Sequence, residues 1–265
     1  MRFGSIRSEK SDGVATLTLH RPERFNAFDT AMARELRAFW EHVKADPDVV
    51  CVIVTGAGEK AFCTGADVTE VASSDTEARA SESMEDSPFL HMTAIHNRCW
   101  KPVIAALNGM VVGGGLHFVA DADLVLAAEH VTFLDTHVKV GLVAGLEPVG
   151  LARRIPLEAV MRLALLGGSE RMSAQEALRL GLVGEVLPAA QLMPRARELA
   201  AKIAQHSPAA LMRTKQAIWE SLDVGLHQGL ARAWEIIGHH GSHPDVKEGA
   251  TAFVEKRKPR WQAPR

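Results

Sequence analysis

Two apolar segments place the strongest constraint on the fold of this 265-residue chain. The segments "VVCVIVTG" (49–56) and "PVIAALNG" (102–109) are continuous apolar runs containing Val and Ile, and each ends at a glycine. A strand that is apolar on both sides must be covered on both faces, as in a parallel sheet between helices. The sequence therefore predicts an α/β fold.

The flanking segments alternate between strand-like and helix-like patterns. We expect strands over 13–22, 123–129 and 131–135, and a helix over 29–46. Asp29 or Thr30 is expected to cap this helix, because short polar side chains accept hydrogen bonds from free N–H groups at a helix start. Strands separated by helices favour βαβ units and a mainly parallel sheet.

The pattern becomes mostly helical after about residue 148. Helices are expected over 172–183, 190–205, 207–222 and 243–261, the first with Ser173 as cap and Glu176 completing a capping box. We interpret 1–200 as an α/β core and 201–265 as a helical C-terminal region that covers the core or mediates assembly.

The overall composition excludes several classes of partner. The net charge is −2 and no apolar run is long enough to span a bilayer, so neither nucleic acid nor a membrane is an expected partner. The N-terminal stretch has no apolar signal core, and three cysteines without ligand spacing indicate a reducing, cytoplasmic location. The stretch "HHGSH" (239–243) also lacks an established ligand spacing, so no metal site is predicted and a solvated turn is expected there.

A glycine triplet marks the candidate site. In "VVGGGLHFVADADL" (111–124), Gly113, Gly114 and Gly115 follow an apolar strand and precede a segment that can begin a helix. Such a turn either packs closely or presents free N–H groups to an anion. A second small-residue turn, "TGAD" (64–67), follows another strand. Two turns of this kind can direct two N–H groups at one oxygen, as an oxyanion hole requires.

Several segments, in order, resemble the enoyl-CoA hydratase/isomerase (crotonase) superfamily. They are "RFNAF" (24–28), "AFCTGADV" (61–68), "NGMVVGGGLHFVADADLVLA" (108–127), "FLDTHVKVGLVAG" (133–145), "SAQEALRLGLVGEVLP" (173–188) and "EGATAFVEKRKPRW" (248–261). The resemblance implies a spiral of ββα turns with a helical C-terminal part, a homotrimer or a dimer of trimers, and an acyl-CoA thioester as substrate with no separate cofactor.

The resemblance also implies roles for individual residues. The N–H groups of Ala66 and Gly114 would form the oxyanion hole for the thioester carbonyl. The expected CoA-binding residues are Arg24, Ala27, Thr64, Gly65, Asp67 and Val68, together with Phe253 and Lys256 on the last helix. By contrast, we expect Cys63 to be a small buried residue and not a nucleophile.

The chain departs from the family at two acidic positions. Where the hydratases carry two glutamates, this sequence has His117 and His137. Histidine is a competent acid or base near neutral pH, and we expect His117 as the base and His137 as the acid, held by Asp135 or Thr136. Substrate positioning and a role without chemistry remain alternatives. Glu147 is a third candidate, although helix capping also explains it.

The leading functional interpretation is an acyl-CoA enzyme of the hydratase/isomerase type. A CoA-ester hydrolase and a C–C-cleaving homologue use the same enolate stabilisation, so the fold alone does not separate them. A non-catalytic acyl-CoA-binding protein and, less favoured, a nucleotide-binding α/β protein are alternatives from other classes.

Overall fold

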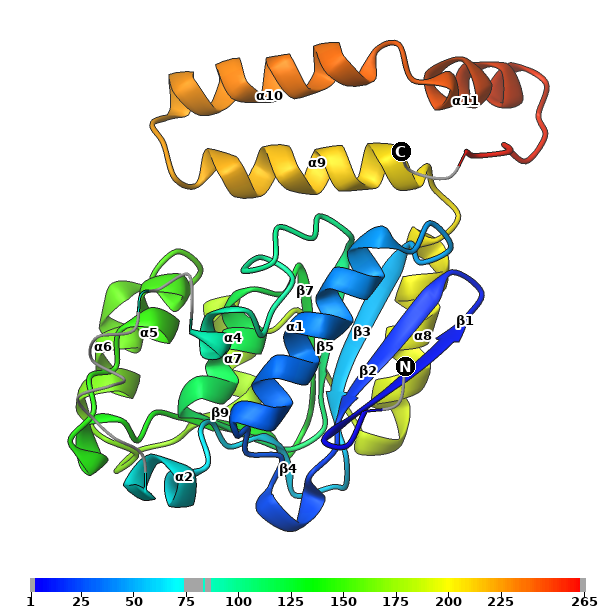
Figure 1. Ribbon diagram of the computed structural model, residues 1–265. Coiled ribbons are helices and arrows are strands. Elements are labelled where there is room, and N and C mark those ends of the chain that lie inside the picture. Colours follow the sequence, from blue (N-terminus) through cyan, green and yellow to red (C-terminus); the bar gives the residue numbers. More distant parts are fainter. Residues whose placement is uncertain (1–2, 74–82, 84–86, 263–265) are drawn as a thin grey trace.

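A computed structural model describes residues 3–73, 83 and 87–262 (Figure 1). Its larger sheet has six strands in the order β1-β2-β3-β5-β7-β10. All neighbours are parallel except the antiparallel pair β1 and β2. The strands are β1 (Ile6–Ser11), β2 (Val14–Leu19), β3 (Cys51–Gly56), β5 (Val103–Leu107), β7 (Leu124–Ala128) and β10 (Glu185–Leu187).

A smaller sheet of four strands lies beside it, in the order β4-β6-β8-β9. Its strands are β4 (Ala61–Cys63), β6 (Met110–Val112), β8 (Thr132–Leu134) and β9 (Met172–Ser173). Three times along the chain, a strand of the large sheet is followed by a strand of the small sheet and then by a helix. This repeat is the ββα spiral that the sequence predicted.

The helices follow in chain order. They are α1 (Thr30–Ala45), α2 (Val68–Ser73), α4 (His117–Ala120), α5 (Leu146–Leu151), α6 (Leu157–Leu165), α7 (Ala174–Leu180), α8 (Ala189–Ile203), α9 (Pro208–Ser221), α10 (Leu226–His240) and α11 (Pro244–Val254). Single 3-10 turns occur at Pro22–Arg24, Pro88–Leu90, Gly113–Leu116 and Val138–Val140. None of the described helices combines the length and apolar character needed to cross a bilayer.

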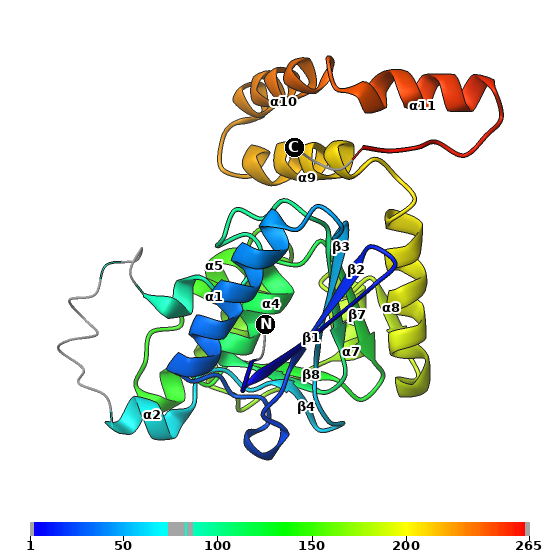
Figure 2. The same cartoon turned by 45° about the vertical axis from the view of Figure 1, so that its right-hand side comes forward.

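The central strands are covered on both faces, as their composition predicted. Every residue of β3 and β5 is buried, and Figure 2 shows α1 and α8 on opposite sides of the large sheet. Helix α1 buries one apolar face that includes Met32, Leu36 and Phe39. This double coverage forms the hydrophobic core.

Local signals fix several helix starts. The side chain of Asp29 accepts a hydrogen bond from Met32 N at 2.8 Å and caps α1. Ser173 Oγ accepts from Glu176 N at 3.1 Å and caps α7. Ser207 Oγ caps α9, where Pro208 occupies the first turn. The last helix ends at Val254, earlier than expected, and α10 had not been recognised from the sequence.

The last three helices form a layer of their own above the spiral (Figure 1). Asp123, directly before β7, anchors α9 to the core. Its carboxylate accepts hydrogen bonds from Val103 N and Trp219 Nε1, both at 2.7 Å, and pairs with Lys215 Nζ at 2.7 Å. One half-buried carboxylate therefore joins two strands of the core to the covering helix.

Candidate active site

The glycine triplet forms a 3-10 turn between β6 and α4, so His117 is the first residue of a short helix. Gly114 sits under an aromatic ring, because a Cβ there would lie 2.5 Å from Phe28 Cζ. Gly113 adopts a φ of +49°, and a Cβ there would approach the ring of His137 at 3.3 Å. The turn therefore brings the backbone so close to Phe28 and His137 that a larger residue at Gly113 or Gly114 would displace their rings.

The second turn meets the first. Gly65 has a φ of +83°, and a Cβ on it would lie 2.9 Å from Gly114 N. Ala66 forms an isolated parallel bridge with Phe28, in which Phe28 N donates to Gly65 O and Asp67 N donates to Phe28 O. Within the described part of the chain, neither Ala66 N nor Gly114 N donates a hydrogen bond. Two free amides thus belong to turns in direct contact.

His117 is buried in the site, with 5 % of its surface exposed. Its Nε2 lies 3.3 Å from Glu147 Oε1. Burial lowers the pKa of His117 to about 4, and the neighbouring His96 adds to this effect. Loss of solvation is the largest cause, because a charged imidazole is disfavoured in a buried site. His117 is therefore uncharged at neutral pH.

His137 is held by an aspartate. Asp135 Oδ1 lies 2.8 Å from His137 Nδ1 and accepts a hydrogen bond from His137 N, also at 2.8 Å. The hydrogen bond to Asp135 raises the pKa of His137 above its usual value. His137 thus retains a proton more readily than His117 does.

Glu147 connects the two histidines. Helix α5 places its carboxylate so that Oε1 lies 3.3 Å from His117 Nε2 and 3.9 Å from His137 Nε2. The side chain is buried, and burial raises its pKa. On sequence alone, Glu147 was only a third candidate, because helix capping also explained it. The fold places it at the centre of the cluster.

His96 and Asp121 complete the cluster. His96 Nε2 lies 3.3 Å from Asp121 Oδ2, and the rings of His96 and His117 meet edge to face with centroids 5.2 Å apart. Sequence reasoning did not single out His96 as a site residue. No periodicity in the segment before β5 indicates that it folds over α4.

These three residues are also the ones that could approach a metal ion. Donor atoms of His96, His117 and Asp121 all lie within 4.8 Å of one another. We interpret the 3.3 Å approach of His96 Nε2 to Asp121 Oδ2 as a direct polar contact between the two side chains.

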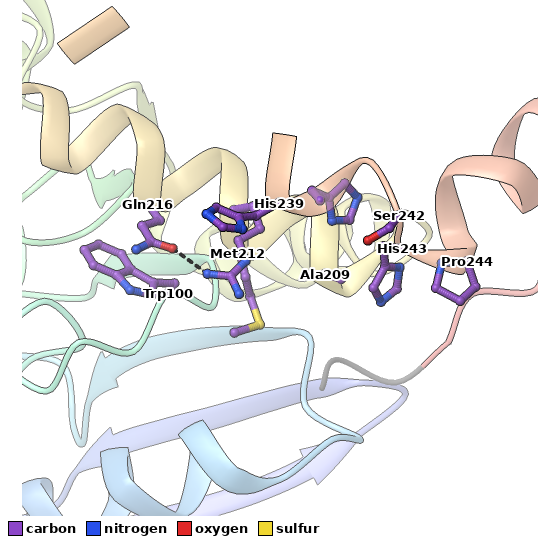
Figure 3. Close-up of a pocket in the computed structure, with 10 residues that line it drawn as sticks. Trp100, Ala209, Met212, Gln216, His239, Ser242, His243 and Pro244 are labelled. Atoms are coloured by element: carbon purple, nitrogen blue, oxygen red, sulfur yellow. Dashed lines mark hydrogen bonds between the residues drawn. The ribbon is translucent and has the colours of Figure 1, made fainter. Parts of the chain in front are cut away.

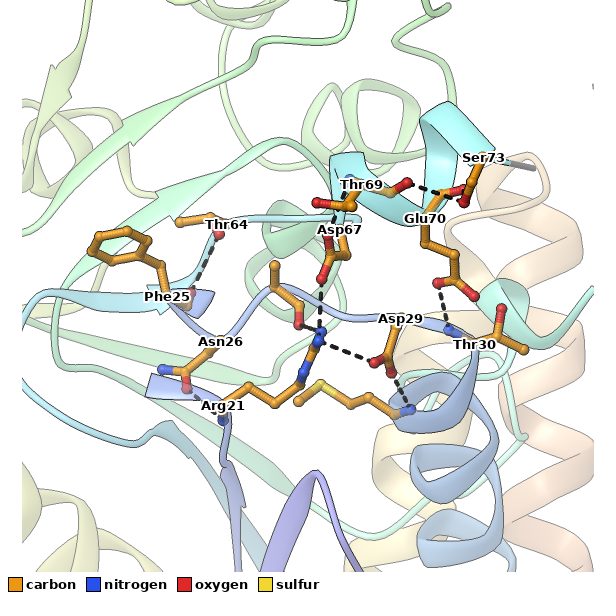
Figure 4. Close-up of polar contacts among 12 residues, drawn as sticks. Arg21, Phe25, Asn26, Asp29, Thr30, Thr64, Asp67, Thr69, Glu70 and Ser73 are labelled. Carbon is orange, nitrogen blue, oxygen red and sulfur yellow. Dashed lines mark hydrogen bonds and ion pairs between the residues drawn. The ribbon is translucent and has the colours of Figure 1, made fainter. Parts of the chain in front are cut away.

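The turn expected to bind CoA is held by a half-buried arginine, Arg21 (Figure 4). Arg21 donates to Ala27 O at 2.7 Å, and its Nη2 lies 3.1 Å from both Asp67 Oδ2 and Asp29 Oδ2. Asp67 also accepts a hydrogen bond from Thr69 N. Asp67 therefore fixes the turn, and Arg21 is a structural residue that the motif did not single out.

The other residues of this region lie around the same turn. Arg24 is exposed beside Asp67 and lines a surface cavity of about 360 Å³. Thr64 Oγ1 donates to Phe25 O at 3.3 Å, and Val68 is 66 % exposed. This cavity is lined by Asp67, which directly follows Ala66 in the turn. Cys63 is fully buried, and burial raises its pKa to about 12.

The last helix lies away from this turn within one chain. Figure 1 places α11 at the opposite end of the molecule from α2. Phe253 on α11 is 87 % exposed, and Lys256 follows the helix with a φ of +54°. A single chain therefore does not bring these two residues to the expected CoA surface.

The "HHGSH" stretch also lies apart from the acid–base cluster. It lines a cavity of about 280 Å³ against α9 (Figure 3). The rings of His240 and His243 stack with centroids 5.1 Å apart. His243 accepts a hydrogen bond from Asp245 N and caps α11.

Known proteins are similar to this chain in fold and in sequence. The sequence profile described as enoyl-CoA hydratase/isomerase matches residues 9–264. A protein named (E)-benzylidenesuccinyl-CoA hydratase, from Thauera aromatica, is 40 % identical over 97 % of this chain and 98 % of its own length.

The chain belongs to the enoyl-CoA hydratase/isomerase family.

Other members agree with this assignment. A short-chain-enoyl-CoA hydratase from Clostridium acetobutylicum is 34 % identical over 97 % of both chains. The crystal structure of an enoyl-CoA hydratase/isomerase from Mycobacterium paratuberculosis superposes with a TM-score of 0.88 at 38 % identity, covering 99 % of this chain and 100 % of that one. The protein is thus an acyl-CoA enzyme of the crotonase type.

Proposed function

We propose that this family member hydrates an enoyl-CoA thioester. The observation that carries the proposal is the position of Glu147 between His117 and His137, next to two turns with free amides. Hydration needs one group that takes a proton from water and another that gives a proton to carbon. The histidines differ in this respect, because the pKa of His117 is lowered and that of His137 is raised.

The amides of Ala66 and Gly114 would serve as the oxyanion hole. Addition to the β-carbon of the enoyl thioester moves charge onto the carbonyl oxygen, giving an enolate. Two N–H groups without internal acceptors suit that oxygen, and one such donor is typically worth about 3–4 kcal/mol. The contact of the two turns at Gly65 and Gly114 supports this assignment.

The proton steps then balance. A water molecule adds its oxygen to the β-carbon while the Glu147–His117 pair takes its proton. The electrons of the double bond form the enolate, and the α-carbon takes a proton from the His137 imidazolium. The pair then returns its proton from Glu147 Oε1 to His137 Nε2, across the 3.9 Å that separates them. The cluster regains its starting protonation without an external base.

The remaining assignments concern CoA and assembly. Arg24, Ala27, Thr64, Gly65, Asp67 and Val68 would bind CoA, which is part of the substrate, so no separate cofactor is proposed. Phe253 and Lys256 would reach CoA bound to a neighbouring copy in a homotrimer or a dimer of trimers. Their exposure at the far end of the chain supports this reading. Three buried cysteines, none in a disulfide, fit a cytoplasmic location.

Turnover of defined CoA esters tests the proposal. Crotonyl-CoA and an aryl-substituted enoyl-CoA are the first substrates, the second because of the name of the Thauera relative. We expect loss of the conjugated-thioester absorbance and formation of the 3-hydroxyacyl-CoA. Glu147→Gln should lower kcat at least about 100-fold, because acid–base groups contribute that much. Glu158→Gln, on the exposed face of α6, is the matched control.

The same assay separates the alternatives. Release of free CoA would indicate a hydrolase, and a shortened acyl-CoA would indicate C–C cleavage. Binding of CoA esters without any product would indicate a non-catalytic binding protein. Wild-type turnover by Glu147→Gln would contradict the role given to this residue.

A further inference from the structure

A second aspartate–histidine pair, Asp121 and His96, lies next to His117. His96 belongs to the segment before β5, and Asp121 directly follows α4. His96 Nε2 lies 3.3 Å from Asp121 Oδ2, which also accepts a hydrogen bond from Thr93 Oγ1 at 2.6 Å. Asp121 is thus held in place and can orient the imidazole of His96.

This orientation leaves one nitrogen of His96 unused. His96 Nδ1 is buried and has no hydrogen-bond partner among the residues that the structure describes. A proton on Nδ1 would therefore be a buried donor without an acceptor, which is costly. The neutral ring with its proton on Nε2, facing Asp121, avoids this cost, so the pair also fixes the tautomer of His96.

The ring of His96 packs directly against His117. The centroids are 5.2 Å apart and the planes cross at 78°. The other ionisable groups around His117 are Glu147 on α5, His137 after β8 and Asp121 at the end of α4. The neutral ring of His96 keeps water away from His117, and loss of solvation is the largest cause of the lowered pKa of His117.

We propose that His96, held by Asp121, is a positioning residue that fixes the ring of His117 and keeps it uncharged toward Glu147. This inference rests on the proposed function, since an uncharged His117 is what allows the Glu147–His117 pair to take the proton of water. His96 itself need not touch substrate.

Histidine NMR and pH–rate profiles of two variants test the inference. His96→Gln removes the imidazole, and His96→Phe keeps an aromatic ring that cannot be charged. In protein labelled with ¹³C-histidine, the signal of His117 is assigned by its loss in His117→Gln. We expect the pKa of His117 to rise toward the ordinary value of 6.5 in His96→Gln, whose smaller polar side chain admits water, and to stay low in His96→Phe, which keeps the aromatic cover over His117.

The kinetic consequence has a defined sign. With a higher pKa in His96→Gln, His117 becomes charged at a higher pH, so the acidic limb of kcat/KM should move upward by the same amount. The alkaline limb should stay in place. His42→Gln, on the exposed surface of α1, should leave the His117 signal and both limbs unchanged.

The outcome is separable from that of the proposed function, because the NMR measurement requires no turnover. An unchanged pKa of His117 in His96→Gln would overturn the inference even in an active hydratase. A raised pKa in a protein that hydrates no enoyl-CoA would support the contact while the hydratase proposal failed.

Discussion

At the scale of single residues, the site is a balanced set of three imidazoles and three carboxylates. His96, His117 and His137 lie near Asp121, Glu147 and Asp135. Their charges depend on burial and on contacts only a few ångströms long. The sequence predicted the convergence of His117 and His137 and the support from Asp135, through the resemblance to the family. It could not rank Glu147 or find His96, because both depend on how loops distant in sequence pack together.

The alkaline limb of the pH–rate profile should depend on Asp135. The hydrogen bond that the His137 ring donates to Asp135 raises the pKa of His137, so Asp135→Asn should lower that pKa. His137 would then lose its proton at a lower pH, and the alkaline limb of kcat/KM should move down by about one unit or more. Kinetics from pH 5 to 10 measure this shift. Asp223→Asn, at an exposed position, should not move the limb.

The uncharged state of His117 should reduce the stability of the folded protein at acid pH. The pKa of His117 is about 4 in the folded protein against 6.5 for an ordinary histidine. The unfolded chain therefore binds more protons below pH 6.5, and this group reduces stability as the pH falls toward 4. Between pH 7 and 4, the free energy of unfolding of the wild type, measured in urea, should fall by roughly 3 kcal/mol more than that of His117→Gln. Equal losses would show that His117 titrates normally in the folded protein.

At the scale of elements, caps and apolar periodicity gave reliable predictions. Asp29, one of two candidates for its helix, and Ser173 cap the helices expected of them, and the continuous apolar runs became covered strands. Helix α10 was not predicted, because its first residue follows Gly225, which has no side chain to cap the helix start. The two turns that bear Ala66 and Gly114 were expected to direct their N–H groups at one oxygen, which stays a prediction, and the contact between the turns depends on the register between β4 and β6.

Gly114→Ala should damage both packing and activity. The added methyl would lie 2.5 Å from Phe28 Cζ and would force the aromatic ring or the turn to shift. We expect a loss of about 1–3 kcal/mol in unfolding free energy, as for overpacked cores, and a fall in kcat of at least about tenfold from the misplaced amide. Urea titration and steady-state kinetics measure the two effects.

Gly184→Ala is the matched control for this prediction. A Cβ on Gly184 meets only Val125 O, at an ordinary 3.6 Å. Unchanged stability and activity are expected. If Gly114→Ala behaved in the same way, the close approach of the two turns would be irrelevant to function.

At the scale of the whole molecule, the covering helices leave an apolar face open. Leu226, Leu230, Trp234 and Ile237 lie on one side of α10 and are 75, 59, 74 and 57 % exposed. Large side chains exposed in one stripe mark a surface that binds another protein surface. This stripe supports the proposed assembly, which periodicity alone could not distinguish from a simple cover.

Trp234→Glu should disrupt that assembly. A buried charge in an apolar interface is strongly unfavourable, so we expect the variant to elute as a smaller species than the wild type. Light scattering coupled to size-exclusion chromatography measures the masses. Gln228→Glu, on the other side of α10 and exposed, should keep the wild-type mass. A monomeric wild type would contradict the proposed trimer.

The anchor at Asp123 ties these scales together. One carboxylate holds the start of β5, an indole and an ammonium group of α9, and it stands two residues beyond Asp121. The covering helices and the segment that carries Asp121 are therefore connected through one carboxylate, that of Asp123. In the proposed assembly, contact of a neighbouring copy with α9 would be transmitted through this carboxylate to β5 and to the segment that carries Asp121.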